Sequence, residues 1–127
     1  MKFNGVQHWL DTLSTGNPEA VTNLYLPRAV LVATFEAEPL QGKREILGYM
    51  KEFLGGKPGL SGKICSQILQ CPAPNVCVVS GVYEFAWPSS YGGTMIEKKQ
   101  KARFTYVFEK TVNGWGILTH HSSVLPE

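Results

Sequence analysis

The C-terminal part of the chain decides the fold: residues 95–124 read MIEKKQKARFTYVFEKTVNGWGILTHHSSV. Two runs in it, 95–110 and 115–124, are rich in the β-branched and aromatic residues that favour strands. Between them lies Asn113-Gly114, a dipeptide suited to a tight hairpin turn because both residues accept positive φ. We therefore predict two long antiparallel strands joined at this turn.

Strand character continues towards the N-terminus. Residues 60–70 and 76–87 are β-rich, and the segment 71–75, CPAPN, separates them with two prolines. A further β-branched and apolar run covers residues 29–37. We expect the last four strands to form an antiparallel meander, with the 29–37 strand added to the same sheet.

Three other stretches have helical spacing. Gly16 ends the first; Asn17 caps the second, which runs on to Pro27; and the pair Gly55-Gly56 closes the third. Their apolar faces are Val6, Trp9, Leu10 and Leu13; Val21, Leu24 and Tyr25; and Ile46, Leu47, Met50, Phe53 and Leu54.

The resulting order of elements is ααβαββββ, within one domain spanning residues 1–127. Helices collected at the start of a chain and strands at its end are typical of an α+β fold. We expect three helices packed on one face of a curved, cone-shaped antiparallel sheet.

Composition narrows the class of protein. The chain has 127 residues, of which 43% are hydrophobic and 17% charged, and its formal net charge is +2. This is too apolar for a disordered chain and too weakly basic for a dedicated nucleic-acid or membrane-surface binder. No apolar run is long enough for a transmembrane helix, and the first residues lack the apolar core of a signal peptide. We therefore expect a cytoplasmic protein without nucleic-acid or membrane partners.

The three cysteines, Cys65, Cys71 and Cys77, are odd in number and six residues apart. A secreted disulfide scaffold normally has an even set, and apolar strand segments accommodate free cysteine as a small hydrophobe. We expect reduced structural thiols.

Several strings of the sequence resemble the nuclear transport factor 2-like superfamily of cone-shaped domains, which includes the SnoaL-like proteins. Besides Trp9, they are GNPEAVTNLY (16–25), AVLVATF (29–35), SGVYEF (80–85), ARFTYVFEK (102–110) and GWGILTHHSSVLPE (114–127). The last two look most like the association (hub) domain of calcium/calmodulin-dependent protein kinase II and its stand-alone bacterial relatives. The superfamily includes isomerases, cyclases, dehydratases and assembly modules, so the resemblance implies a fold and not a single activity.

Arg103 is the first candidate site residue. In the strand 95–110, Ala102, Phe104, Tyr106 and Phe108 share one face and Arg103, Thr105 and Val107 the other. The hub domain has an arginine at the matching position, in its acid-binding pocket, so the resemblance implies that Arg103 lines the cavity and binds an anion. An ion pair of Arg103 with Glu84 or Glu36 is the structural alternative.

The position of Arg103 also bears on assembly. With Arg103 inside the cavity, Phe104, Tyr106 and Phe108 would lie on the outer face of the sheet, and we expect a homodimer to bury them.

His120 and His121 are adjacent on a strand, so they face opposite sides and do not chelate one metal together. We place His120 in the cavity first and His121 second; a hydrogen-bonded structural histidine is the alternative for either. Ser122 shares the face of His120 and stands where the hub motif has a basic residue. We expect no metal and no cofactor.

Aromatic residues complete the candidate site. Tyr83 shares a strand face with Phe85 and Trp87, while Tyr25 and Trp9 come from the helices; such a set forms either core or the wall of a pocket. Among the acidic residues none stands out as a general base.

Three functions follow. The first is a homo-oligomeric domain whose cavity binds a small anionic or aromatic ligand. The second is a SnoaL-like isomerase, cyclase or dehydratase with His120 or His121 as acid–base and Arg103 as oxyanion support. The third is an assembly module with a vestigial pocket.

Overall fold

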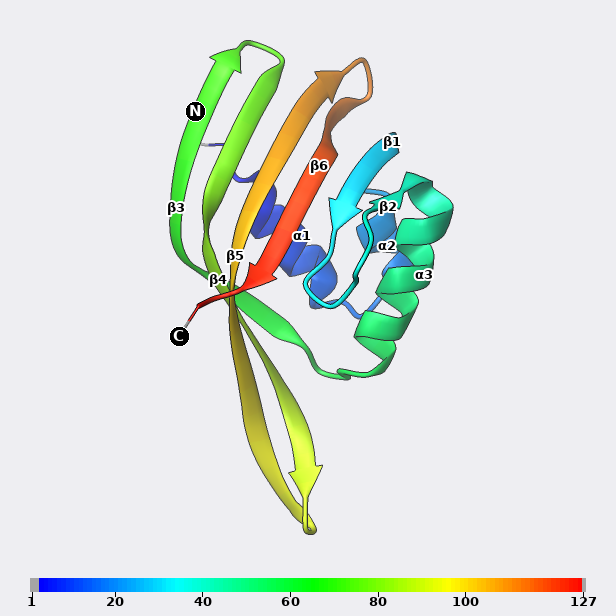
Figure 1. Cartoon of the computed structure of the whole chain (residues 1–127), viewed down its shortest axis with the longest axis vertical. Coiled ribbons are helices and arrows are strands. Elements are labelled where there is room, and N and C mark those ends of the chain that lie inside the picture. The colour runs from blue at the N-terminus through cyan, green and yellow to red at the C-terminus, as the bar shows by residue number, and fades with distance from the viewer. Residues whose placement is uncertain (1–2, 127) are drawn as a thin grey trace.

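The computed structural model describes residues 3–126 and contains a curved six-stranded sheet with the helices on its concave side (Figure 1). The strand order is β2-β1-β6-β5-β4-β3. β1 and β6 are parallel, and every other pair is antiparallel. The elements are α1 (Gly5–Leu13), α2 (Pro18–Thr22), β1 (Tyr25–Val32), β2 (Leu40–Gln41), α3 (Gly42–Gly55), β3 (Ser61–Ala73), β4 (Val76–Tyr91), β5 (Thr94–Thr111) and β6 (Gly114–Val124). The predicted α+β fold and the C-terminal antiparallel meander are confirmed. The sheet is mixed and not wholly antiparallel as predicted, because β1 pairs in parallel with β6, and the short strand β2 was not predicted.

The prediction was wrong about where the second helix gives way to the first strand. α2 ends at Thr22, and Tyr25 already belongs to β1. The cause is pairing with the other end of the chain: Tyr25 lies opposite Ile117 of β6, and the Ile117 amide donates to the Leu24 carbonyl at 2.9 Å. This ladder outweighs the helical spacing of the apolar residues. β1 therefore covers residues 25–32. The predicted strand 29–37 began too late and ended too late, because residues 33–39 form a loop.

The core lies between the concave face of the sheet and the helices. Val6, Trp9, Leu10 and Leu13 of α1 are all buried there, as the helical spacing indicated. Among residues 3–126, no helix combines the length and the hydropathy of a membrane span.

Phe104, Tyr106 and Phe108 face this core and are buried. The prediction that they form an aromatic patch on the outer face was wrong, so they offer no surface for the homodimer inferred from that patch. The alternation along β5 was assigned correctly, but the two sides were exchanged. Three aromatic rings remove far more apolar surface from water than Thr105 and Val107, and the outer position leaves the charge of Arg103 hydrated.

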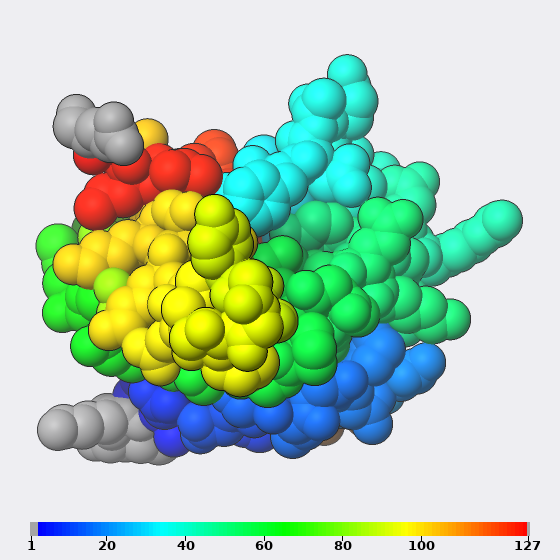
Figure 2. Space-filling view, turned by 90° about the horizontal axis from the view of Figure 1, so that it is seen from below, coloured from blue at the N-terminus to red at the C-terminus, as the bar shows by residue number. Residues whose placement is uncertain are grey.

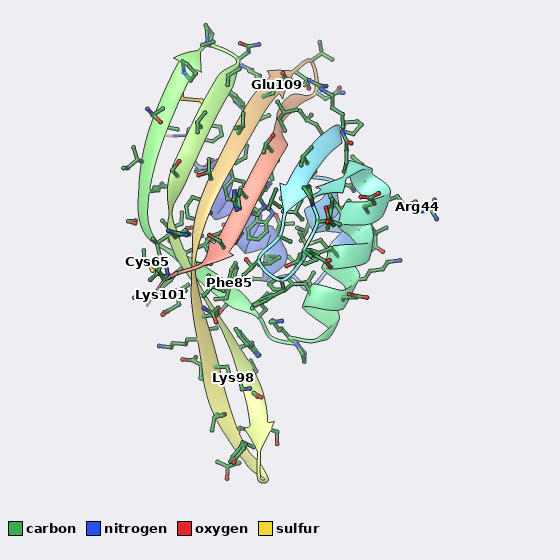
Figure 3. All side chains as sticks on the ribbon, viewed as in Figure 1. Arg44, Cys65, Phe85, Lys98, Lys101 and Glu109 are labelled. Atoms are coloured by element: carbon green, nitrogen blue, oxygen red, sulfur yellow. A yellow bond between two sulfur atoms is a disulfide. The ribbon has the colours of Figure 1, made fainter. Side chains whose placement is uncertain are left out.

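The paired ends of β4 and β5 extend beyond the rest of the sheet as an arm, residues 87–98 (Figure 1). Trp87 and Lys98 pair at its base, and Lys98 lies along the arm in Figure 3. Tyr91 and Met95 near its tip are exposed. The base of the arm is the part that concerns the site, because Trp87 reaches the cavity described below.

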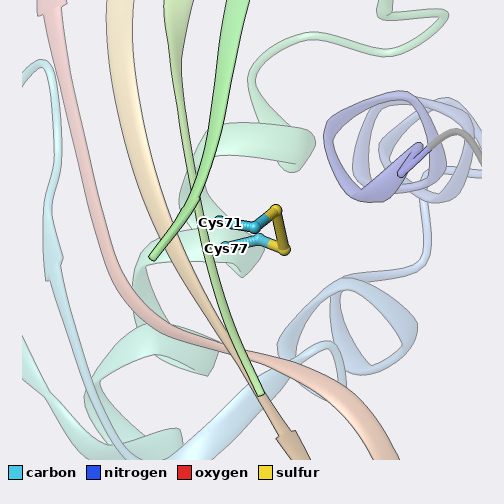
Figure 4. The surroundings of a disulfide bond; sticks show 2 residues. All are labelled: Cys71 and Cys77. Atoms are coloured by element: carbon cyan, nitrogen blue, oxygen red, sulfur yellow. A yellow bond between two sulfur atoms is a disulfide. The ribbon is translucent and has the colours of Figure 1, made fainter. Parts of the chain in front are cut away.

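A disulfide joins Cys71 and Cys77, at the ends of β3 and β4 that face each other across the turn (Figure 4). Cys65 is free and exposed. The expectation of three reduced thiols was therefore wrong: strand pairing brings two residues six apart side by side across a hairpin. Since disulfides are rare in cytosolic proteins, the cysteines no longer support a cytoplasmic location.

Candidate functional site

The candidate site is a cavity between the concave face of the sheet and α1 and α3. Its inner end is lined by Trp9 of α1, Tyr83 of β4, and His120 and Ser122 of β6. Its outer end is lined by Phe35, Phe53, Lys57 and Trp87. Figure 2 shows this end of the molecule, where the arm, the segment before α3 and the end of α3 meet.

His120 lies at the centre of a hydrogen-bonded chain. The Tyr25 hydroxyl is 2.8 Å from His120 Nδ1, and the Tyr83 hydroxyl is 3.2 Å from Nε2. Trp9 Nε1 donates to the Tyr25 oxygen at 3.1 Å, and Tyr83 donates to Ser122 Oγ at 2.8 Å. Four of the predicted site residues, Trp9, Tyr25, Tyr83 and Ser122, are thus brought together around the histidine.

The direction of the chain fixes the state of the imidazole. An indole N–H only donates, so Trp9 makes the Tyr25 oxygen an acceptor and directs the Tyr25 proton to Nδ1. Since Tyr83 gives its proton to Ser122, its oxygen is free to accept from Nε2–H. His120 is therefore the neutral tautomer with its proton on Nε2.

Burial agrees with this assignment. Desolvation, and to a smaller extent the charge of neighbouring His121, lowers the pKa of His120 from 6.5 to about 3. Burial also raises the pKa values of Tyr25 and Tyr83, so that both hydroxyls keep their protons. The inner end of the cavity is therefore uncharged at neutral pH.

Ser122 ends the chain on the cavity wall. Its oxygen accepts from Tyr83 and, at 2.8 Å, from Thr34 Oγ1. Both accepting positions of a hydroxyl are then used, and its own hydrogen is left over. The arrangement presents one hydrogen-bond donor to a molecule in the cavity.

Tyr106 packs against the same histidine, and its hydroxyl lies near that of Tyr83, so that each of the two hydroxyls influences the pKa of the other. Its ring stacks on the imidazole, with centroids 3.8 Å apart and planes at 14°. Its hydroxyl is buried and, among residues 3–126, has no hydrogen-bond partner. The ring holds the imidazole in place from one side.

Arg103 and His121 lie outside the cavity. In the ladder between β4 and β5, Tyr83 is opposite Ala102 and Val82 is opposite Arg103. Residues directly opposite each other point to the same side of a sheet, so Tyr83 and Arg103 do not share a face. Both Arg103 and His121 border a shallow hollow on the outer face. The expectation that Arg103 lines the cavity was wrong.

The charged side chain that does reach the cavity is Lys57, which the sequence analysis missed. Its ammonium nitrogen lies 5.8 Å, 4.7 Å and 5.4 Å from the ring centroids of Phe35, Phe53 and Trp87. The sequence gives little indication that Lys57 lines the cavity, because Lys57 and the three aromatic residues are scattered along the chain and only the fold brings them together.

The cavity is small as it stands. Its volume of about 40 Å³ admits a few water molecules, each of which needs roughly 10–15 Å³ on the same measure. A larger guest requires the outer side chains to move. Phe35, in the loop before α3, is 62% exposed, and Lys57 is a flexible side chain beside it.

Comparison with known proteins agrees with the fold. The profile of the SnoaL-like domain family matches residues 4–127. The chain belongs to this family. This match confirms the resemblance to the nuclear transport factor 2-like superfamily. No curated protein matches the chain at a significant level.

Several solved structures have a fold similar to that of this chain. A protein of Xanthomonas campestris, provisionally named a calcium/calmodulin-dependent protein kinase II association domain, is 33% identical, with a TM-score of 0.87. The match covers 98% of this chain and 85% of that protein. A dehydratase, also provisionally named, of the nuclear transport factor 2-like family from Streptomyces avermitilis has 15% identity and a TM-score of 0.82, covering 97% and 93% of the two chains. The second likeness is one of fold alone.

Proposed function

We propose that this domain binds a small molecule whose uncharged aromatic body enters the cavity and places a hydrogen-bond acceptor, such as a carbonyl oxygen, against Ser122. The observation that carries the proposal is the one-way chain from Trp9 through Tyr25, His120 and Tyr83, which ends on a Ser122 hydroxyl with a hydrogen to give. The apolar wall around it suits an aromatic body.

Of the two ligand classes expected from the sequence, the aromatic one is favoured over the anionic one. Arg103 lies on the outer face, and His120 is neutral. An anion at the inner end would lose its hydration without meeting a positive charge. A homodimer is not part of this proposal, because the outer face lacks the aromatic patch from which it was inferred.

A thermal-shift panel tests the proposal. Acetophenone has an aromatic body and one acceptor, toluene has the body without the acceptor, and benzoate adds a negative charge. We expect acetophenone to raise the melting temperature most, toluene less, and benzoate least. Equal responses to all three, or the strongest response to benzoate, would refute the proposed ligand class.

Catalysis is a second candidate function, supported by the contact between His120 and the two tyrosine hydroxyls. Both ring nitrogens of His120 already make hydrogen bonds, so His120 has no free nitrogen for a substrate. Tyr83 is therefore the group that would exchange a proton with the substrate. The version that relied on His121 and Arg103 loses both residues, since they lie outside the cavity. An isomerisation or dehydration assay with Tyr83→Phe tests this candidate: loss of turnover with retained ligand binding would support it.

A further inference from the structure

We propose that Phe35, Phe53 and Trp87 form a binding site for the ammonium group of a ligand, which the side chain of Lys57 fills when no ligand is bound. The inference extends the proposed function, because it assigns a positively charged group to the outer end of a ligand whose aromatic body enters the cavity.

The geometry is that of an aromatic cage. Three rings, from the loop between β1 and β2, from α3 and from the base of the arm, lie within 6 Å of one ammonium nitrogen. The faces of aromatic rings carry negative charge density and attract cations at this distance, and such cages recognise alkylammonium groups. The three rings therefore form a site with the dimensions for one such group.

The rings are the principal partners of the Lys57 ammonium. Among the described residues, no carboxylate oxygen lies within 4.0 Å of it. The lysine is thus not held in place by an ion pair, and a flexible four-carbon chain is all that ties it to the cage. A competing ammonium group would lose no salt bridge by displacing it.

The surrounding charge favours a cation. Glu36 lies next to Phe35 in the chain and acts on Tyr49, which also lines the cavity: burial first, and then the Glu36 carboxylate, raises the pKa of Tyr49 to about 12. When Lys57 leaves the cage, the carboxylate remains near the entrance. An incoming cation then meets a favourable field, and an incoming anion does not.

Position makes the lysine a competitor of the ligand. The cavity holds only about 40 Å³ with Lys57 in the cage, so an aromatic guest that carries an ammonium group enters only when the Lys57 side chain leaves the cage and the outer side chains move apart. A tethered competitor weakens the apparent affinity by the fraction of molecules in which it has left the site. Removing it should strengthen the binding of an ammonium ligand, whereas a lysine that anchors an anion would have the opposite effect.

Calorimetric titration with benzyltrimethylammonium tests the sign of this effect. If Lys57 leaves the cage in a tenth of the molecules or fewer, Lys57→Ala should bind the probe at least about tenfold more tightly than wild type. Phe53→Leu should bind it roughly three- to thirtyfold more weakly, by the loss of one ring. Lys51→Ala is the matched control. Lys51 is an exposed lysine of α3, the helix that carries Phe53, and its replacement should leave the affinity unchanged.

Two further probes separate this inference from the proposed function. Acetophenone has no charge, so its binding tests the cavity alone, and benzoate carries the opposite charge. If acetophenone binds but Lys57→Ala fails to strengthen binding of benzyltrimethylammonium, the cage inference is wrong and the proposed function stands. If wild type binds benzoate and Lys57→Ala weakens that binding, Lys57 is an anion anchor and the inference is overturned. If neither acetophenone nor benzyltrimethylammonium binds to wild type or to Lys57→Ala, the cage inference and the proposed function are both wrong.

Discussion

The hydroxyl of Tyr25, at the first residue of β1, lies 2.8 Å from Nδ1 of His120, 95 residues later in the chain. This contact joins the parallel pair of strands to the centre of the cavity. It also fixes the imidazole tautomer, because Trp9 already donates to the Tyr25 oxygen. The uncharged inner end of the cavity follows from this one relationship.

Replacing Tyr25 by phenylalanine should destabilise the protein. The change leaves Trp9 Nε1 and His120 Nδ1 buried without a partner, at a cost of about 1–3 kcal/mol. Chemical denaturation measures the free energy of unfolding. Tyr91→Phe, at an exposed position on the arm, is the control and should change it by less than about 0.5 kcal/mol. Equal stability of the two variants would mean that the Tyr25 contact contributes nothing.

Acid should destabilise the protein through His120. The pKa is about 3 when folded and near 6.5 when unfolded, so the unfolded chain binds the proton first as pH falls. The stability is fully present above pH 6.5 and decreases towards pH 3. Between pH 6.5 and pH 5 this group alone should remove on the order of 1–2 kcal/mol.

The matched variant for this pH dependence is His120→Gln. Its unfolding free energy should vary less with pH over the same interval, by about the amount given for His120. Identical pH profiles in wild type and variant would show that His120 does not titrate with a lowered pKa.

Tyr106→Phe should stabilise the protein or leave it unchanged. The Tyr106 hydroxyl is buried without a hydrogen-bond partner among residues 3–126, and its removal ends that desolvation cost while keeping the ring on His120. We expect a gain of up to about 1 kcal/mol in thermal or chemical denaturation. A loss greater than about 1 kcal/mol would indicate that the neighbouring Tyr83 hydroxyl or a water molecule satisfies this hydroxyl.

Reduction of the disulfide should lower stability moderately. Cys71 and Cys77 close a loop of only a few residues, for which the chain-entropy relation gives about 2 kcal/mol. The double variant Cys71→Ser/Cys77→Ser should therefore unfold at lower denaturant concentration, and a reducing agent should shift wild type but not the variant. Cys65→Ser is the control, since Cys65 is free. An unchanged midpoint for reduced wild type would contradict the expected contribution.

The strands of the C-terminal meander were predictable because their signals are local: alternation, β-branched runs and the Asn113-Gly114 turn. The boundary near Tyr25 was not, because its strand conformation depends on pairing with Ile117, far along the chain. Local spacing carries no information about such a partner.

For the site, alternation placed His120 and Ser122 on one face and His121 on the other, as the structure has them. It did not tell which face was inner. Register would have excluded Arg103, since Val82 and not Tyr83 lies opposite it. Lys57 and its three rings come from separate elements, so only the folded chain shows them together.

The most direct test of the central claim, that the inner cavity ending at Ser122 binds the ligand, is calorimetric titration of acetophenone into wild type, Ser122→Ala and Arg103→Ala. The account predicts that Ser122→Ala weakens binding roughly three- to tenfold, by the loss of one hydrogen bond, and that Arg103→Ala binds as wild type does. Unchanged binding by Ser122→Ala together with weakened binding by Arg103→Ala would place the ligand on the outer face and contradict the account.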